Sequence, residues 1–420
     1  RSTQAKTLFP YTTLFRSFPG DMHYVLGLQE TVVVGMADGY AQATRNASFV
    51  NLHSAAGVGH AMANIFTAFK NRTPMVITAG QQTRSLLQFD PFLHSNQAAE
   101  LPKPYVKWSC EPARAEDVPQ ALARAYYIAM QEPRGPVFVS IPADDWDVPC
   151  EPITLRKVGF ETRPDPRLLD SIGQALEGAR APAFVVGAAV DRSQAFEAVQ
   201  ALAERHQARV YVAPMSGRCG FPEDHALFGG FLPAMRERIV DRLSGHDVVF
   251  VIGAPAFTYH VEGHGPFIAE GTQLFQLIED PAIAAWAPVG DAAVGNIRMG
   301  VQELLARPLT HPRPALQPQL LQAGGAAFDL RLQVGIRQVL PLHRQGGARR
   351  PADRCPLRQL VQQHRGYGTG EMGRARHAAD VTASPYPAPG KHWHLHIFLV
   401  AHNACLARAS APSPPLVKRR

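Results

Sequence analysis

The sequence has few cysteines, no long apolar run and no secretory signal pattern. Its 420 residues include five cysteines, and none of them form a Cys-X-X-Cys pair. This sparse, odd set argues against a disulfide framework and against a zinc site, and it favours a reduced, cytoplasmic chain. No uninterrupted run of about 18 apolar residues occurs, which argues against a membrane span. The first residues lack a basic region followed by an apolar core, so we expect no secretory signal.

A glycine-rich nucleotide motif is also missing. The run Val186–Val190 follows an expected strand, but it lacks the spaced glycines of G-X-G-X-X-G. Those glycines let a pyrophosphate approach the backbone at the start of a helix. A dinucleotide-dependent enzyme is therefore disfavoured.

Acidic residues become scarce near the C-terminal end. Residues 1–306 hold 25 Lys and Arg against 31 Asp and Glu, whereas residues 307–420 hold 17 against 4. The net charge of +7 thus comes from the last part of the chain. A basic segment can bind nucleic acid or an anionic membrane, but this one has few lysines and little aromatic interleaving. We expect neither a nucleic-acid nor a membrane partner.

Between residues 18 and 150 the pattern alternates between strands and helices. Such alternation predicts an α/β domain with a doubly wound parallel sheet. The expected strands are Val25-Leu26, Phe49–Leu52, Met75–Ala79 and Val137–Ile141, and the expected helices are Glu30–Ala43, Val58–Lys70 and Val118–Gln131.

A proline-rich break then leads into a second α/β pattern over residues 165–307. We expect a Rossmann-like central domain here. Its expected strands are Ala183–Val186, Val210–Ala213, Val248–Ile252 and Gln273–Ile278, with a helix over Ala195–His206.

The two ends of the chain differ from these domains. Residues 1–17 have no initiating Met, and we interpret them as a foreign or junction segment. Residues 308–420 are rich in Arg, His, Pro, Ala and Gly with poor periodicity, and we expect an irregular basic tail that is disordered or poorly structured. Our hypothesis is that this tail results from out-of-frame translation of a GC-rich gene.

Glu30 is the most informative single residue. It leads a helix on which Val33, Val34, Ala37 and Ala41 share its face. A charge on an apolar face is costly unless something pairs with it. From the residues alone, a Glu stabilised by the helix dipole near an N-terminus is the preferred explanation.

Several motifs together change that preference. The run Leu28–Ala43 resembles the pyrimidine-binding segment of thiamine-diphosphate enzymes, specifically of benzoylformate decarboxylases. Further segments resemble the same family in its order and at its spacing: Phe49–Gly57 (FVNLHSAAG), Thr78–Arg84 (TAGQQTR), Val106–Ser109 (VKWS), Asp144–Trp146 (DDW) and Val251–Pro255 (VIGAP). The resemblance covers about residues 18–307. It implies thiamine diphosphate and Mg²⁺ as cofactors and a small 2-oxo acid as substrate.

The resemblance also implies roles for individual residues. Glu30 matches the carboxylate that hydrogen-bonds the aminopyrimidine of the cofactor. His53 and His260 match two histidines that transfer protons during decarboxylation of an aromatic 2-oxo acid such as benzoylformate. Phe92 and Leu93 match an apolar segment near the substrate ring. Without the resemblance, both histidines would be read as loop histidines and Phe92 and Leu93 as ordinary loop packing.

The sequence departs from the family pattern in ways that bear on activity. No Gly-Asp-Gly occurs, although the family holds Mg²⁺ and the diphosphate with that motif and a following Asn. The family's N-terminal segment with its substrate-binding Ser is missing, and His60 stands where the family usually has Asn. We therefore predict that this chain is inactive as written. By family, subunits pair into dimers and tetramers, with the active site between them.

Two alternatives to a decarboxylase stay open. An acetolactate-synthase-like carboligase would share the fold, but that family has Gly-Pro-Gly where this chain has Ser54–Gly57. A non-catalytic fragment that at most dimerises is the second. A metal site at His392–His396 (HWHLH) is disfavoured, because no Asp or Glu lies nearby to orient the rings.

Overall fold

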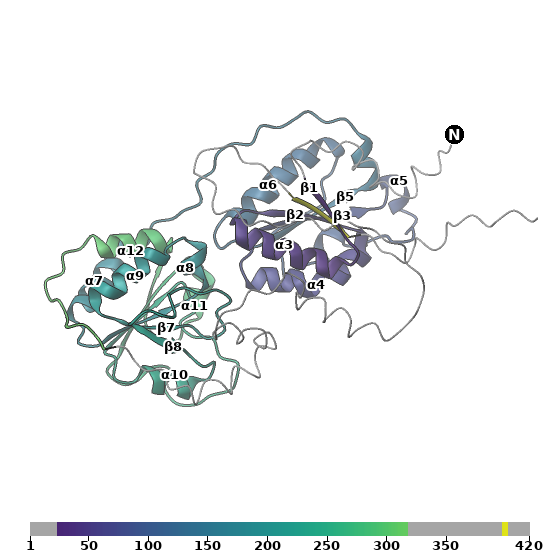
Figure 1. The fold of residues 1–420 in the computed structure, drawn as a ribbon. Helices are drawn as coiled ribbons and strands as arrows, with labels where there is room; N and C mark the ends of the chain where they lie inside the picture. Colours follow the sequence, from purple (N-terminus) through teal and green to yellow (C-terminus); the bar gives the residue numbers. More distant parts are fainter. Residues whose placement is uncertain (1–22, 318–396, 402–420) are drawn as a thin grey trace, which may run out of the picture. The chain divides into compact units, whose positions relative to one another are not determined.

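The computed structural model describes residues 23–317 and 397–401, which form two parallel-sheet α/β domains (Figure 1). The first sheet has the strand order β1-β12-β2-β3-β5-β4, and every pairing in it is parallel. Its strands are β1 (His23–Gly27), β2 (Ser48–Leu52), β3 (Met75–Gln81), β4 (Ser109–Cys110), β5 (Pro136–Pro142) and β12 (Ile397–Ala401).

Helices connect these strands as crossovers, as the alternating pattern predicted. They are α3 (Glu30–Thr44), α4 (Ser54–Lys70), α5 (Arg84–Leu87) and α6 (Val118–Met130), with short 3₁₀ turns η1 (Ala98–Glu100), η2 (Ala115–Asp117) and η3 (Ala143–Asp147). The predicted helices and strands of this domain are confirmed, with ends that differ by a few residues. The largest difference is α4, which begins at Ser54 rather than Val58.

The strand β12 was not predicted. It lies between β1 and β2, pairing in register with Val25 on one side and Val50 on the other through Leu399. The rest of the segment predicted to be irregular, from residue 318 to 396 and from 402 onward, lies outside the described residues.

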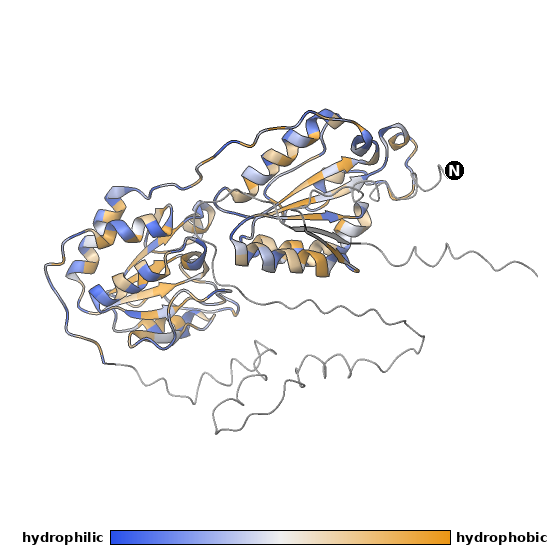
Figure 2. Cartoon of the chain, turned by 45° about the horizontal axis from the view of Figure 1, so that its top comes forward, coloured by the Kyte–Doolittle hydropathy of each residue, from blue (hydrophilic) through white to orange (hydrophobic). Residues whose placement is uncertain are grey.

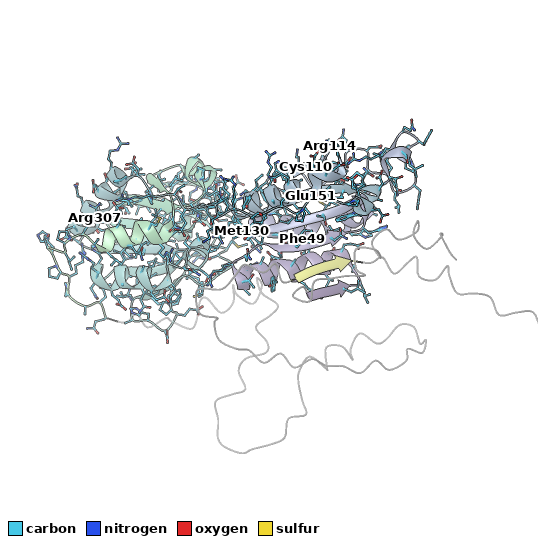
Figure 3. All side chains as sticks on the ribbon, turned by 90° about the horizontal axis from the view of Figure 1, so that it is seen from above. Phe49, Cys110, Arg114, Met130, Glu151 and Arg307 are labelled. Atoms are coloured by element: carbon cyan, nitrogen blue, oxygen red, sulfur yellow. The ribbon has the colours of Figure 1, made fainter. Side chains whose placement is uncertain are left out.

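Both faces of the first sheet are buried. Along β3, Ile77 belongs to the core cluster beneath α3 and α4, while Val76 belongs to the cluster beneath α6. The strands β2, β3 and β5 are accordingly buried along their whole length and mostly apolar, as expected of a parallel sheet covered on both faces (Figure 2). Phe49, Cys110 and Met130, labelled in Figure 3, all belong to the α6 layer.

The central domain repeats this architecture. Its parallel sheet has the order β11-β10-β9-β6-β7-β8. The strands are β6 (Pro182–Val186), β7 (Arg209–Val212), β8 (Phe228–Phe231), β9 (Val248–Ile252), β10 (Gln273–Ile278) and β11 (Asp291–Val294). The helices are α7 (Pro166–Gly178), α8 (Ala188–Arg192), α9 (Phe196–His206), α10 (Arg236–Leu243), α11 (Pro281–Trp286) and α12 (Ile297–Leu305). Pro166 is the first residue of α7, which Asp165 caps.

The order in which successive strands are added to this sheet reverses between β6 and β9. Open α/β sheets commonly bind ligands at such a point. Here the loops after the two strands lie against each other. The amide of Gly187 donates to the carbonyl of Ile252 at 3.0 Å, and a β-carbon at Gly187 would lie 2.7 Å from the carbonyl oxygen of Gly253. The loops after β6 and β9 are therefore packed closely against each other.

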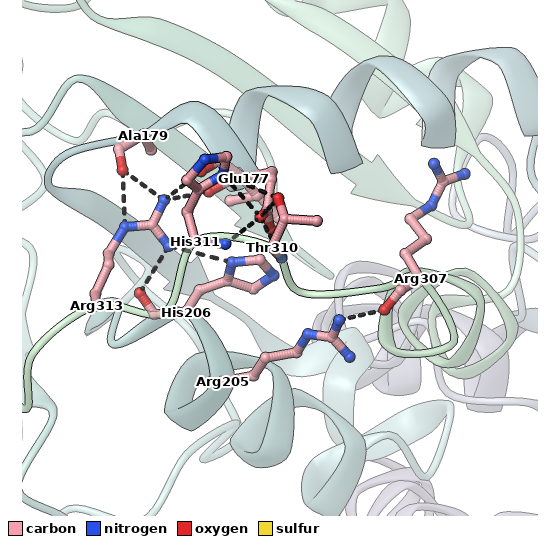
Figure 4. Close-up of polar contacts among 9 residues, drawn as sticks. Glu177, Ala179, Arg205, His206, Arg307, Thr310, His311 and Arg313 are labelled. Carbon is pink, nitrogen blue, oxygen red and sulfur yellow. Dashed lines mark hydrogen bonds and ion pairs between the residues drawn. The ribbon is translucent and has the colours of Figure 1, made fainter.

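Residues 308–317 pack on the central domain and form what we call the strap. The Arg313 guanidinium donates to carbonyls at the end of α7, including that of Ala179 at 2.7 Å (Figure 4). The backbone amides of Thr310 and His311 both donate to Glu177 at 2.6 Å. Contacts with the central domain therefore continue ten residues past residue 307, its predicted end.

Candidate active site

The first turn of α3 places Glu30 at the carboxyl end of β1. The side-chain oxygen of Gln29 accepts a hydrogen bond from the Val32 amide at 3.0 Å and so caps the helix. Glu30 is only 2% exposed. The residues predicted to share its face are buried as well: Val33, Val34, Ala37 and Ala41. The costly arrangement that the sequence suggested, a carboxylate on an apolar face, is therefore present.

The two carboxylate oxygens of Glu30 have different surroundings. Oε2 lies 3.3 Å from Nδ1 of His60, on the second turn of α4. Oε1 is buried and has no hydrogen-bond partner. A β-carbon at Gly57 would lie 3.5 Å from this oxygen, so glycine keeps space open beside it. A buried acceptor without a partner is costly, and a ligand that donates to it would remove that cost.

His53 lies beside the same carboxylate. It follows β2 directly and occupies the N-cap position of α4, where its carbonyl accepts from the Gly57 amide at 2.8 Å. A β-carbon at Gly57 would lie 3.6 Å from the His53 β-carbon, so a side chain at this position would meet both Glu30 and His53. The structure thus brings two of the predicted site residues together at the carboxyl edge of the first sheet.

Ser54 follows the N-cap residue His53 and does not itself cap α4. It is the first residue of the helix, with φ of +47° and a buried hydroxyl that has no hydrogen-bond partner. The positive φ turns the chain sharply after His53 and is strained for a residue other than glycine. Strain of this kind is concentrated at functional sites.

Phe92 and Leu93 lie on the segment that follows β3. Phe92 is 87% exposed, and its carbonyl accepts from the Gln82 side chain at 2.9 Å. Gln81, the last residue of β3, binds the Ser95 carbonyl at 2.8 Å. The segment is therefore fastened to the same sheet edge as His53, with its aromatic ring pointing into solvent.

A surface hollow of about 390 Å³ lies beside that segment. It is lined by Gln81, His94 and Glu111 among others, but not by Phe92 or Leu93. Glu111 accepts from the Ser140 hydroxyl at 2.7 Å, and His94 Nδ1 lies 2.8 Å from Asp90. Its polar groups are thus largely satisfied within the protein.

Two of the motifs that carried the resemblance meet in space. Arg84 forms a bidentate pair with Asp145, with distances of 3.1 and 2.8 Å, and its amide donates to Asp144 at 3.2 Å. The hydrogen bonds to Asp145 raise the pKa of Arg84 above its ordinary value. This pair fixes the start of α5, and hence the origin of the segment that carries Phe92.

His260 lies in the central domain, on the loop after β9. Its ring is exposed, and its backbone amide donates to the Ala234 carbonyl at 2.9 Å. The same loop is held on α10, because the His264 amide donates to Glu237 at 2.5 Å. The Arg236 guanidinium also lies 4.0 Å from the centre of the Phe267 ring. The described contacts of the His260 loop are therefore with its own domain.

In the sequence, His60 stands out only as a departure from a family pattern. Its contact with Glu30 was not predicted, although a signal existed. His53 and His60 are seven residues apart, which is two helical turns, so both can face the same neighbour.

The residues that the structure describes form no cluster of potential metal ligands. Residues 23–317 and 397–401 contain no group of three His, Cys, Asp or Glu side chains that could hold an ion. The His392–His396 motif lies outside these ranges. Within them, no helix is long and apolar enough to cross a membrane.

Comparison with known families gives two matches along the chain. Residues 6–101 match the thiamine pyrophosphate enzyme N-terminal TPP binding domain, and residues 169–304 match the thiamine pyrophosphate enzyme central domain. The first match includes Glu30 and His53, and the second includes His260.

Individual proteins agree with these matches. The chain is 45% identical to a benzoylformate decarboxylase of Pseudomonas aeruginosa, over 74% of this chain and 60% of that protein. The crystal structure of benzoylformate decarboxylase from Polynucleobacter necessarius is similar, with a TM-score of 0.71 and 43% identity over 74% of this chain and 58% of that one. A thiamine diphosphate-dependent 4-hydroxybenzoylformate decarboxylase from Rhodococcus jostii RHA1 gives a TM-score of 0.70 and 37% identity, over 74% and 59%.

Acetolactate synthases are more distant. The large subunit from Haemophilus influenzae is 27% identical, over 68% of this chain and 51% of that protein. The chain spans about 60% of the length of the benzoylformate decarboxylase that it matches. It belongs to the thiamine pyrophosphate enzyme family, of which it carries the N-terminal and the central domain.

Proposed function

We propose that the protein to which these two domains belong decarboxylates an aromatic 2-oxo acid such as benzoylformate, without oxidation, with thiamine diphosphate as cofactor. The observation that carries the proposal is the Glu30 carboxylate, which is buried beside His53 and has one oxygen without a partner. The similarity to benzoylformate and 4-hydroxybenzoylformate decarboxylases supports the choice of substrate class.

In this proposal Oε1 of Glu30 would accept a hydrogen bond from the cofactor's pyrimidine in the imino form, which carries a proton on its ring nitrogen. A donor there would satisfy a buried acceptor that the protein leaves unpaired. Thiamine diphosphate supplies the carbon nucleophile and the electron sink that loss of CO2 from a 2-oxo acid requires. The apolar face around Glu30 excludes water and strengthens the hydrogen bond.

The two histidines are proposed to transfer protons. His53, which lies near Glu30 across Gly57, would handle the substrate carboxylate and carbonyl. His260, on an exposed loop, would return a proton to the carbon that loses CO2. Phe92 and Leu93 would cover the aromatic ring, which accounts for an exposed phenylalanine at the sheet edge.

Mg²⁺ is proposed as a second cofactor of the whole protein. The described residues offer it no site, and the sequence has no Gly-Asp-Gly with which to bind the metal and the diphosphate. We accordingly propose that this polypeptide has no decarboxylase activity by itself. A non-catalytic fragment is the second candidate, and this missing motif favours it.

A carboligase of the acetolactate synthase kind is less well supported. The segment after β2 reads Ser54-Ala-Ala-Gly57, and the matching identity is 27% against 45% for a benzoylformate decarboxylase. We also propose self-association into dimers and tetramers, by analogy with the family, and a cytoplasmic setting, on the sparse cysteines alone.

A chimera tests the proposed activity. Residues 18–317, which include the strap, would be joined to the N-terminal segment and the C-terminal domain of the Pseudomonas aeruginosa relative, and benzaldehyde formation from benzoylformate would be followed with thiamine diphosphate and Mg²⁺. We expect turnover in the chimera and none in the 420-residue chain. Glu30→Gln should abolish turnover, whereas Glu197→Gln on α9 should not. A folded chimera that decarboxylates pyruvate but not benzoylformate would refute the proposed substrate class.

A further inference from the structure

The contact between His60 and Glu30 has a consequence for the proposed site. The His60 Nδ1 atom lies 3.3 Å from Oε2 of Glu30. The two side chains differ greatly in exposure, because 54% of the His60 side chain faces solvent and only 2% of Glu30 does. An exposed imidazole thus reaches a buried carboxylate and links it to the solution.

The position of His60 is fixed by contacts between α3 and α4. The Thr31 hydroxyl donates to the carbonyl of His60. One turn further along α4, the Asn64 side chain donates to the carbonyl of Thr31 at 2.6 Å. These two hydrogen bonds fasten the turn that carries His60 to the first turn of α3, so the imidazole is held close to Glu30.

The other carboxylate oxygen, Oε1, lies beside Gly57, is buried and has no hydrogen-bond partner. One oxygen of Glu30 therefore has a partner within the protein and the other has none. A carboxylate held in this way presents a single acceptor in a fixed direction.

We propose that His60 is a positioning residue that holds Oε2 of Glu30 and directs Oε1 toward the cofactor's pyrimidine. This inference rests on the proposed function. An asparagine at this position could donate a hydrogen bond to Oε2 but would not change its charge. An imidazole changes its charge between about pH 5 and 8. The titratable group in contact with the His60 ring is Glu30, from α3.

The charge state of His60 alters what Glu30 can offer. A neutral ring with its proton on Nδ1 donates to Oε2 and leaves the carboxylate with its full negative charge. A protonated ring forms an ion pair, which partly neutralises the carboxylate and weakens its hydrogen bond to the pyrimidine. A protonated His60 would therefore weaken binding of the pyrimidine relative to a neutral His60.

A double-mutant cycle on the 420-residue chain tests the contact without cofactor. The variants are Glu30→Gln, His60→Asn and the pair, compared by the equilibrium constant of urea unfolding. We expect the two changes to couple by about fivefold at pH 6 and by less at pH 8, because the ion pair forms only with a charged ring. His264→Asn, an exposed histidine on another loop, serves as the matched control and should show no coupling. A coupling factor of one at both pH values would overturn the proposal.

Cofactor binding gives the second measurement. Calorimetric titration with thiamine diphosphate and Mg²⁺ would compare the wild-type chain with His60→Asn at pH 6 and pH 8. We expect the affinity ratio of variant to wild type to be about fivefold larger at pH 6. A ratio that does not change with pH would contradict the assigned role. If neither chain binds the cofactor at any pH, that result counts against the proposed function, and the double-mutant cycle still decides whether His60 holds Glu30.

Discussion

Acidification should weaken the central domain through His206, the last residue of α9. This side chain is 5% exposed, and its Nδ1 lies 3.3 Å from the Arg313 guanidinium of the strap. Burial, followed by the charges of Arg313 and Arg205, lowers the pKa of His206 from 6.5 to about 4. The folded domain therefore keeps this imidazole neutral at pH values where an unfolded chain would protonate it.

The sign and size of the effect follow from proton linkage. The unfolded chain takes up a proton on His206 as the pH falls through about 6.5, and the folded chain does so only near pH 4. The contribution is therefore complete above pH 6.5 and is lost as the pH falls toward 4. Since one pKa unit corresponds to about 1.4 kcal/mol, the full loss is about 3 kcal/mol. The Thr310 hydroxyl and then the strap amides lower the pKa of Glu177 to about 2, so this carboxylate matters only below about pH 4.5.

Urea unfolding read by hydrogen-exchange mass spectrometry can follow α9 separately from the rest of the chain. Between pH 7 and pH 4, the wild type should lose about 3 kcal/mol more stability than His206→Gln, which stays neutral throughout. His311→Gln is the control, because the His311 side chain is 79% exposed. If the wild type and His206→Gln lost stability equally, the reasoning from burial would be refuted.

Three glycine substitutions give further predictions. Gly39→Ala should stabilise the chain by about 0.5–1 kcal/mol in thermal unfolding, because a β-carbon there meets nothing within 4 Å and alanine favours the helix α3. Gly187→Ala should destabilise it by more than about 2 kcal/mol, since the added carbon would lie 2.7 Å from a backbone oxygen; a stable variant would show that the loops after β6 and β9 separate easily. Gly57→Ala should leave unfolding almost unchanged, because its nearest contacts would be at 3.5 Å, but should weaken thiamine diphosphate binding measured by calorimetry. Unaltered affinity in that variant would argue against a ligand at Oε1 of Glu30.

Much of the first domain could be predicted because its pattern is local. Residue spacing predicted the apolar face of α3 and the strand ends near Glu30 and His53. The structure has this buried face and these strand ends at the predicted residues. The helix α7 carried a local signal too, Asp165 as cap and Pro166 as first residue, but a proline-rich neighbourhood hid it. The strand β8 reads Phe-Gly-Gly-Phe, and glycine weakens any strand signal.

The remaining features depend on residues far apart in the sequence. The His60 contact joins two helices through side chains 30 positions apart, and Arg313 reaches carbonyls 134 positions away. The strand β12 completes a sheet whose other strands end by Pro142. Periodicity describes which face of an element is buried, and it does not say which partner covers that face.

The strap moves the point at which the chain leaves the surface of the central domain. Without the strap, the chain would leave the domain at Ala306, where α12 ends. Contacts instead hold the chain to the domain as far as Gln317, whose carbonyl accepts a hydrogen bond from Arg209 at 3.0 Å. Fixing about ten residues removes roughly 35 Å of reach from the tether. A shorter tether raises the effective concentration of a module attached after residue 317, provided that its docking site lies within range. The strap therefore shortens the tether between the central domain and such a module, and releasing the strap would lengthen that tether.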